Sequence, residues 1–529
     1  MEQRQGATHW WPTCGVLLGA LTVALNIGVL NVAIPSMMSS LGTDLERIQW
    51  VQTSYQITQA VMMPAVGWLG SRLGTKRLFL LSTLTFIVGS VLCGLAWDVN
   101  SLIVFRIIQG VGGGPITPLG MSILYSTFPA DKRGLAMGLY NFSFSFGPAI
   151  APALGGHLIE VLNWRAIFYI NVPVGLLSAG IILYTMPNTR DQHARPFDAI
   201  GVFSMAIFLV GLLLAVSEGR RYGWGSELVV MLFVVTGVAL LIFVYTELTI
   251  PRPFVDVRLY ANIPFTMGCL IAFLSTMEFR GTNFLLPIML QRIFHYTPFQ
   301  AGLFFLPPAL VMGMVSILAG RLSDKVAPKP MLIGGLIVLT YVSFQFCFVD
   351  AAVTTGTLLG LFLMRRAAQA FCNSPLTSAA LHGIPEDQVR LASGVFNLHR
   401  TLAGAVGVAL TATLMEARAD VHTVILSERQ SLYPLGTELA TAAVRTALQQ
   451  EGYRGETLNQ MTSTALSLQL GDEATLAGYQ DLFFLFAMQS LLCLIPVLLM
   501  RGGKLQTPGT DAPDQRATPR PSRAPVRGV

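Results

Sequence analysis

Fourteen apolar stretches of about 20 residues, the length that a helix needs to cross a bilayer, constrain the fold of this 529-residue chain. They lie at 13–35, 48–69, 78–97, 101–126, 134–158, 164–186, 197–217, 226–247, 263–287, 299–320, 330–349, 353–380, 391–416 and 479–500. Charged residues make up only 12% of the sequence, about half of their share in soluble globular proteins. No stretch shows the alternating pattern of a membrane β-strand. The sequence therefore predicts an all-α membrane protein.

Four short patterns in the first half of the chain return in the second half, in the same order and 252 to 260 residues later. The pairs are Asn31–Pro35 with Asn283–Pro287, Gly67–Lys76 with Gly320–Lys329, Arg106–Gln109 with Arg366–Gln369, and Gly138–Asn141 with Gly394–Asn397. Four collinear repeats indicate two homologous halves. In membrane transporters such halves flank a central substrate path.

Two of the apolar spans lie between the repeated halves. The predicted segments are a cytoplasmic N-terminus at 1–12, a six-helix half at 13–186, two linking helices at 197–247, a second six-helix half at 263–500 and a disordered tail at 501–529. The second half contains a polar outer segment at 417–477, with a helical pattern from Glu438 to Gln450. The first span is too long for a cleavable signal peptide, so we expect it to stay in the membrane.

Lysine and arginine are unevenly distributed over the predicted loops. With the N-terminus inside, the inner loops hold thirteen of them and the outer loops with their edges hold five. This asymmetry predicts that both termini are cytoplasmic. The net charge of +6 then reflects topology and indicates no nucleic-acid partner. The six cysteines lie in or beside apolar spans without the spacing of metal ligands, so we expect no metal site and no cofactor.

Five local motifs together point to one family. They are Leu25–Pro35 in the first span, Gly67–Arg77 between spans two and three, Arg106–Gly114 in span four, Gly147–Gly156 in span five, and Trp164–Gly175 at span six. Over about residues 13–500 the chain resembles the fourteen-span drug:proton antiporter branch of the major facilitator superfamily. This resemblance implies two six-helix halves plus two extra central helices.

The resemblance also implies a function and a setting. It implies proton-coupled export (antiport) of amphipathic toxic compounds by alternating access, in the inner membrane of a bacterium. The partners it implies are the transported small molecule, protons and the lipid bilayer. Some relatives work with a periplasmic membrane-fusion adaptor and an outer-membrane channel, and the outer segment at 417–477 could contact such an adaptor.

Two positions depart from the family pattern. The first-span motif, which includes Asn31 and Pro35, has Asn26 where the family carries an aspartate, and the loop motif has Ser71 where the family carries another. Because a first-span carboxylate is a favoured proton carrier in such exporters, its absence puts the usual coupling in doubt. Glu278 lies 252 residues after Asn26, at the repeat-equivalent position in span nine. We therefore expect Glu278 to couple transport to protons; the alternative is a structural ion pair with Arg106, Arg366 or Arg400.

Those three arginines lie inside apolar spans, where a charge needs a partner or a water-filled cavity. The recurrence of Arg106 as Arg366 favours a cavity-facing position for both, although a long side chain near a span end can also reach the surface. Arg365 cannot share a helix face with Arg366, so we expect one of the two to sit in a structural pair. His399 also lies inside an apolar span, where a lone histidine is more often a packing residue than a proton relay.

The remaining motifs predict moving parts. The loop motif, with Gly67, Ser71, Arg72, Gly74 and Lys76, acts as a conformational latch in the family, and its second-half copy retains the acid as Asp324. The alternative is a solvated turn. Span five places small residues at Ser143, Gly147, Ala151 and Gly155 on one helix face, with Pro148, Pro152 and Gly156 nearby. This pattern favours close helix packing and, in the family, a seam that bends.

Three classes of function stay open from the residues. The first is the proton-coupled exporter. The second is a transporter of one metabolite or fatty acid-like solute with different coupling, because Asn26 is neutral. The third is a membrane sensor or enzyme that reuses the fold. Against an enzyme, the cytoplasmic loops contain no nucleophile–base pair, phosphate-binding loop or metal-ligand cluster.

Overall fold

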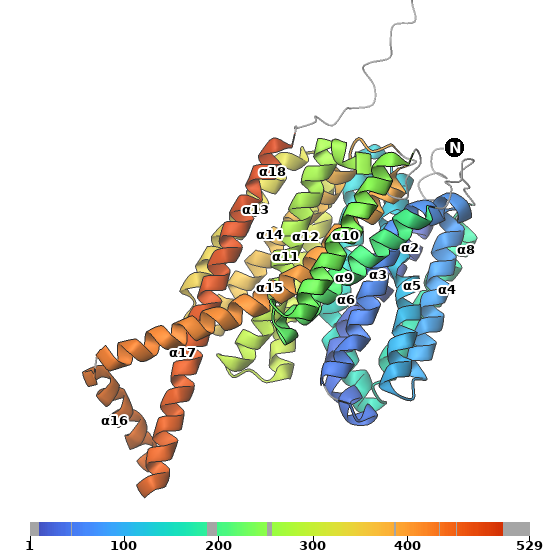
Figure 1. Ribbon diagram of the computed structural model, residues 1–529. Helices are drawn as coiled ribbons and strands as arrows, with labels where there is room; N and C mark the ends of the chain where they lie inside the picture. Colours follow the sequence, from blue (N-terminus) through green and yellow to red (C-terminus); the bar gives the residue numbers. More distant parts are fainter. Residues whose placement is uncertain are drawn as a thin grey trace, which may run out of the picture.

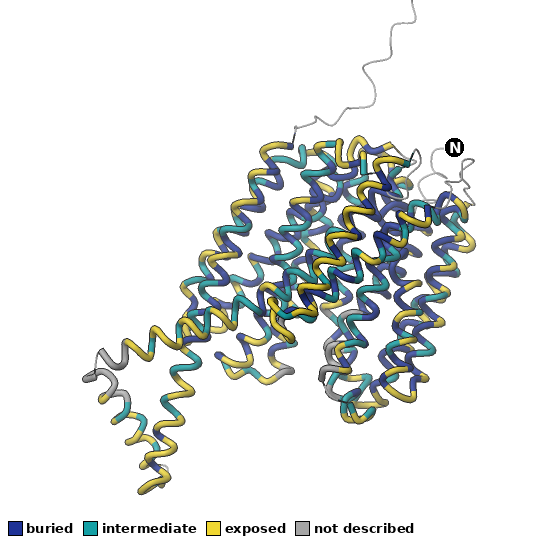
Figure 2. The backbone as a smooth tube through the Cα atoms, viewed as in Figure 1, coloured by how far each residue is buried: buried dark blue, intermediate teal, exposed yellow. Residues whose placement is uncertain are grey.

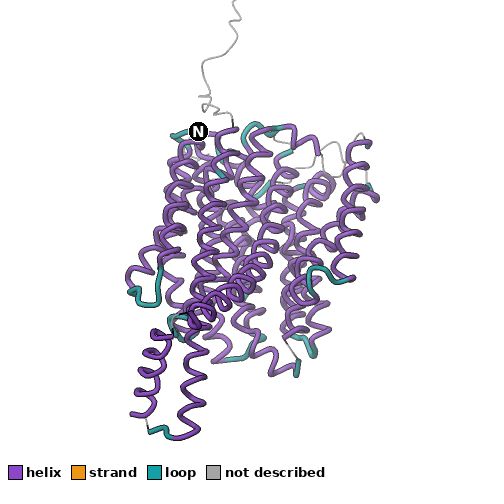
Figure 3. Tube along the Cα trace, turned by 60° about the vertical axis from the view of Figure 1, so that its left-hand side comes forward, coloured by secondary structure: helices purple, strands orange, loops and turns teal. Residues whose placement is uncertain are grey.

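The computed structural model describes residues 10–43, 45–187, 198–250, 257–385, 388–432, 434–450 and 452–500. Within these ranges the chain is helical and contains no strand, as Figure 3 shows. The predicted all-α architecture is therefore confirmed. The predicted disordered tail at 501–529 and most of the predicted N-terminal segment lie outside the described residues.

A helix occupies each of the fourteen predicted spans. The first half consists of α2 (Trp10–Leu41), α3 (Leu45–Leu73), α4 (Thr75–Gly94), α5 (Val99–Thr127), η1 (Ala130–Lys132), α6 (Arg133–Val161), α7 (Ala166–Tyr169) and α8 (Asn171–Thr185). The second half consists of η2 (Val257–Ala261), α11 (Ile263–Arg292), α12 (Pro298–Ser323), α13 (Pro328–Gln345), η3 (Phe346–Phe348), α14 (Thr355–Leu381), α15 (Val389–Leu432), α16 (Pro434–Gln450), α17 (Gly455–Leu492) and α18 (Leu494–Leu499).

The two linking helices, α9 (Ala199–Tyr222) and α10 (Glu227–Thr249), lie on the side of the bundle. α9 packs against α3 of the first half and α15 of the second, while α10 packs against α9. Most residues of α10 are exposed (Figure 2), and Leu241 and Tyr245 are among them. An apolar surface of this kind fits a lipid-facing helix. The linking helices therefore lie beside the two halves and do not separate one half from the other.

Ten helices among the described residues are long and apolar enough to cross a membrane by length and composition alone. The spans α11 and α14 fall outside this set. Both carry ionisable side chains in mid-helix, namely Glu278 and Arg280 on α11 and Arg365 and Arg366 on α14. Charges inside spans mark functional interiors in membrane proteins. The least apolar spans of the second half are thus the ones that build its polar interior.

The start of α2 and the end of α18 lie at the same end of the bundle (Figure 1), which we call the terminal end. From the opposite end, the far end, a hairpin of helices projects beyond the bundle. It consists of the last part of α15, all of α16 and the first part of α17. The segment expected as a polar loop at 417–477 is therefore almost wholly helical. Its sequence has neither Gly nor Pro from Glu416 to Leu432, so nothing ends α15 before Pro434.

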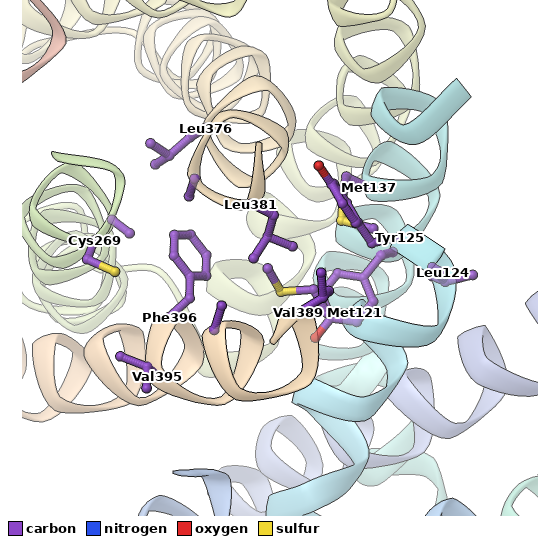
Figure 4. Close-up of a cluster of buried hydrophobic side chains, with 14 of the residues drawn as sticks. Met121, Leu124, Tyr125, Met137, Cys269, Leu376, Leu381, Val389, Val395 and Phe396 are labelled. Atoms are coloured by element: carbon purple, nitrogen blue, oxygen red, sulfur yellow. The ribbon is translucent and has the colours of Figure 1, made fainter. Parts of the chain in front are cut away.

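The two halves come together at the terminal end. One buried apolar cluster takes side chains from α5, α6, α11, α14 and α15, as Figure 4 shows. Met121 and Tyr125 represent the first half in it, and Val389 and Phe396 the second. The packed side chains of this cluster exclude water. Fully burying each large apolar side chain contributes about 1.5–3 kcal/mol to stability. The structure is therefore closed at its terminal end.

Candidate functional site

Arg106 is the centre of a polar cluster inside the first half. It comes from α5 and is only 1% exposed. Its Nε donates to the backbone oxygen of Val51 at 2.9 Å, and its Nη1 donates to Gln109 Oε1 at 2.5 Å and to Asn26 Oδ1 at 3.2 Å. The guanidinium also lies 4.2 Å from the ring centroid of Tyr55, a favourable cation–π distance. Arg106 is held in place by neutral groups.

Asn26 lies on α2 and accepts from three donors at once. Besides Arg106, they are the side-chain amide of Gln109 at 3.3 Å and that of Asn171 at 3.4 Å. Gln109 and Asn171 also donate to Ser90 Oγ, at 2.5 Å and 3.5 Å. None of these contacts involves a carboxylate. Asn26 thus fills the family's acid position with a group that cannot take up a proton at physiological pH.

Glu278 is the centre of the corresponding cluster in the second half. The carboxylate is 1% exposed and pairs through Oε1 with Arg365 Nη2 at 2.7 Å, while Ser490 donates to Oε2 at 3.1 Å. Arg365 also donates to Thr282 Oγ1 at 2.7 Å and to Ser343 Oγ. Four helices, α11, α13, α14 and α17, supply these groups. A buried charge with this many partners is held firmly.

The repeat relates the two clusters, with one correction to the sequence analysis. Asn26 and Glu278 are 252 residues apart, and Ser90 and Ser343 are 253 apart. The arginine that takes the place of Arg106 is Arg365, and not Arg366 as the repeated Arg-x-x-Gln pattern predicted. For Glu278, the alternative to proton coupling was a structural ion pair with Arg106, Arg366 or Arg400, and the structure shows Arg365 as its ion-pair partner instead. The common spacing of Ser90 and Ser343 was the signal that could have identified the cluster.

Arg366 faces a different part of α11. Its Nη2 donates to Asn283 Oδ1, and its guanidinium lies 4.7 Å from the ring centroids of both Phe279 and Phe362. Neighbouring residues of a helix point about 100° apart, which separates Arg366 from the cluster of Arg365. Asn283 is the repeat partner of Asn31, but the side chains of Asn31 and Pro35 lie outside the described residues.

Asp324, directly after α12, contacts the start of α6 across the two halves. Its carboxylate accepts the backbone N–H of Gly134 at 2.6 Å and that of Leu135 at 3.0 Å. Burial raises the pKa of this carboxyl, and the two N–H donors oppose that rise. A carboxylate at a helix N-terminus is favoured both by free N–H groups and by the helix dipole. The structure therefore places the retained acid of the loop motif on a helix end, where it joins the halves.

The first-half copy of the loop motif makes no such contact through its serine. Ser71 Oγ donates to the backbone oxygen of Trp68, within its own helix, at 2.8 Å. Instead, small residues carry the contact: a Cβ at Gly67 would lie 2.9 Å from Leu391 Cδ1, and one at Gly394 would lie 2.7 Å from the Met63 oxygen.

The other named members of this motif lie at the end of α3 and the start of α4. Arg72 is exposed, with its guanidinium 5.0 Å from the ring centroid of Trp68, and Lys76 is partly buried. Gly74 has a φ of +81° as the residue before α4, a backbone conformation that suits glycine.

The small residues of the fifth span pack against α2. A Cβ at Gly147 would lie 2.7 Å from Ala24 Cβ, and one at Gly155 would lie 2.7 Å from Val29 Cγ1. Gly28 of α2 approaches Ala151 and Pro148 in the same way. Gly156 has open space around it, and the side chain of Pro152 lies outside the described residues. The close approach that the spacing predicted is thus present, while bending of α6 stays a prediction.

Contacts between the halves gather near the terminal end. Besides Asp324, they include Asn141 with Ser374 at 3.4 Å and Arg390 with Thr75 at 3.2 Å. Arg400 of α15 reaches Phe144 of α6, 5.9 Å from its ring centroid. His399 instead bonds to Val395 and to Tyr260, on the outer side of α15. In the part of the chain that is described, no group of three His, Cys, Asp or Glu residues could hold a metal.

Comparison with known proteins identifies the family. The sequence profile of the Major Facilitator Superfamily matches residues 16–408. The multidrug export protein EmrB of Haemophilus influenzae is 33% identical over 508 residues, covering 93% of this chain and 96% of that protein. The fatty acid resistance protein FarB of Neisseria gonorrhoeae is 29% identical over 497 residues, again covering 93% and 96%.

A solved structure gives the same fold. The proton:xylose symporter XylE superposes with a TM-score of 0.60 at 13% identity, covering 94% of this chain and 96% of that one. Motifs, helical architecture and sequence similarity agree. The chain belongs to the Major Facilitator Superfamily of secondary transporters, in the fourteen-span branch that its motifs indicated, and is not an enzyme.

Proposed function

We propose that this protein exports amphipathic toxic compounds in exchange for protons, with Glu278 as the residue that carries the coupling proton. The observation that carries the proposal is the buried Glu278–Arg365 pair, at 2.7 Å, in the repeat-equivalent place of Asn26 and Arg106. The name of the EmrB relative, a multidrug export protein, supports the direction of transport and the breadth of substrates.

The chemistry of the pair explains how a proton could drive movement. The ionised carboxylate holds Arg365 against α11 and, through Ser490, also binds α17. Protonation of Glu278 removes the charge that attracts Arg365, and a buried charge without its partner is strongly unfavourable. Arg365 must then find other acceptors or the helices must shift. Proton binding at this one carboxyl group is thereby converted into rearrangement of α11, α14 and α17.

The contact of Asp324 with α6 supplies the second part of the cycle. It holds the two halves together at the terminal end, beside the buried apolar cluster. Opening this end requires the carboxylate to leave the N–H groups of Gly134 and Leu135. Asp324 therefore acts as the latch of the closed state in this proposal, whereas Ser71 of the first-half copy bonds within its own helix.

The proposed setting is the inner membrane of a bacterium, with the terminal end in the cytoplasm, as the distribution of lysine and arginine favours. Cysteine labelling tests this orientation. In a background without Cys14, a cysteine at Lys132 should react only from the cytoplasmic side and one at Glu438 of α16 only from outside. The reverse pattern, or the same side for both, would refute the assignment. In the proposed orientation, the projecting hairpin lies outside and is available to a periplasmic adaptor in a cell with an outer membrane.

A second substrate class is also supported by a relative. The FarB relative is named a fatty acid resistance protein, so export of fatty acid-like solutes is the second candidate. A panel of amphipathic cations, anions and neutral compounds, applied to deletion and overexpression strains with and without an uncoupler, separates the candidates. We expect overexpression to protect against several chemically different compounds and the uncoupler to abolish protection. Protection against none of them, or protection that survives the uncoupler, would overturn the proposal.

A further inference from the structure

Two arginines of the second half lie on the neighbouring helices α11 and α15, near the contact between the halves. Arg280 lies on α11, and its side chain runs along α15, where a Cβ at Gly404 would be 3.3 Å from Arg280 Cγ. Arg400 lies one helical turn before Gly404 on α15. Both side chains are partly buried, and the positive charge of Arg400 acts on that of Arg280. The pair therefore concentrates positive charge at one depth of the molecule.

This charge has no counter-ion among the described residues. Neither Arg280 nor Arg400 forms a hydrogen bond or an ion pair there, whereas Arg106, Arg365 and Arg366 each bind oxygen acceptors. The acid of the neighbouring cluster, Glu278, is occupied by Arg365. An unpaired charge within a membrane span is costly and typically marks a substrate or ion pathway. Two such charges together suit an anion that binds between them.

The surroundings of the pair are apolar on the side of the first half. Arg400 lies over Phe144 of α6, whose ring stacks with that of Tyr140 at 6.5 Å. The next residue, Thr401, contacts the sulfur of Met63 on α3 at 3.3 Å. Aromatic rings and methionine sulfur adapt to varied apolar shapes. A ligand here would meet positive charge on one half and a soft apolar wall on the other.

We propose that Arg280 and Arg400 bind the carboxylate of an amphipathic organic anion, whose apolar body lies against Phe144 and Met63. This inference rests on the proposed export function and specifies its substrate class. Because the charge comes from the second half and the apolar wall from the first, such a ligand contacts both halves. Its binding would therefore respond to their relative movement.

The test compares three probes that share one apolar body. They are 1-pyrenebutanoate, its methyl ester and 1-pyrenebutyltrimethylammonium, titrated by fluorescence against the full-length protein in lipid nanodiscs. We expect the carboxylate to bind at least about tenfold more tightly than the ester, the gain typical of a hydrogen-bonded charge pair. The ammonium should bind more weakly than the ester. Equal affinities of the three probes for the unmodified protein would overturn the proposal.

Variants then locate the site. Arg280→Gln or Arg400→Gln should weaken carboxylate binding about tenfold and leave ester binding unchanged. Arg400→Lys, which keeps the charge but loses the two-pronged donor geometry, should fall between. The matched control is Arg321→Gln, which removes one exposed charge at the end of α12 and should bind all three probes normally. The inference would be contradicted if Arg321→Gln and Arg400→Gln lost carboxylate binding equally. It would also be contradicted if neither Arg280→Gln nor Arg400→Gln lost carboxylate binding.

These binding measurements need no proton gradient. If the carboxylate does not bind selectively but uncoupler-sensitive protection is intact, the inference fails and the proposed export function still holds. Selective carboxylate binding without any protection would instead refute the export function itself.

Discussion

In the first half Arg106 is held by the neutral oxygens of Asn26, Gln109 and Val51, whereas in the second half Arg365 is held by the carboxylate of Glu278. The helices and the serine at each site correspond through the repeat, but the acceptor differs. An amide oxygen keeps its charge state over the physiological pH range, and a carboxylate can bind and release a proton. The comparison teaches that one half is built as a fixed cluster and the other as a titratable one.

The largest difference between the halves should appear in stability. Arg365→Met leaves Glu278 buried without its cation, which should cost about 3–5 kcal/mol. Arg106→Met leaves only neutral acceptors unpaired, which should cost about 1–3 kcal/mol. Thermal unfolding of both variants in the same detergent compares the two losses through the shift of the melting temperature.

A double variant supplies the control for that comparison. Arg365→Met combined with Glu278→Gln removes both charges, so it should recover much of the stability lost in Arg365→Met alone. If Arg106→Met and Arg365→Met melt alike, and the double variant recovers nothing, then the two clusters do not differ in the way described.

The latch offers the next contrast between the halves. Asp324→Asn removes the charge that binds the N-terminus of α6, and we expect about a tenfold loss of export, corresponding to one charge-assisted hydrogen bond. Ser71→Ala removes a bond within a single helix and should leave export within about twofold, because local side-chain bonds of this kind contribute little. Initial export rates at matched protein amounts measure both effects. Equal tolerance of the two substitutions would show that neither motif copy acts as a charged latch.

The smallest effect should come from converting the first cluster into the second. Asn26→Asp places a carboxylate beside Arg106, and the new pair should change stability by no more than about 1 kcal/mol, since its attraction offsets the cost of burying the charge. Export should persist. A loss of folding in Asn26→Asp, with normal folding in Asn26→Ala, would mean that the first-half site cannot accommodate a charge pair.

Much of the architecture could be predicted from the sequence, because long apolar stretches have few structural solutions in a bilayer. The place of Glu278 could also be predicted, since the repeat relates it to Asn26. Its partner could not. Arg365 and Arg366 are adjacent, and only the rotation of α14 against α11 decides which of them meets the acid.

The hairpin shows a second limit of the sequence. A polar segment between two spans is typical of a loop. The stretch after Glu416 has neither Gly nor Pro until Pro434, however, so α15 continues to Leu432. The pair of Arg280 and Arg400 shows a third, because the residues lie 120 positions apart on helices whose mutual rotation no local pattern reveals.

The most direct test of the central claim is export in inverted membrane vesicles driven by an imposed pH gradient, with Glu278→Gln compared with Glu278→Asp and with the unmodified protein. Glutamine keeps the shape and hydrogen-bonding capacity of the side chain but cannot carry a proton. We therefore predict that Glu278→Gln folds and binds substrate yet loses gradient-driven export, while Glu278→Asp retains part of it. Full gradient-driven export by Glu278→Gln would contradict the account and remove Glu278 from proton coupling.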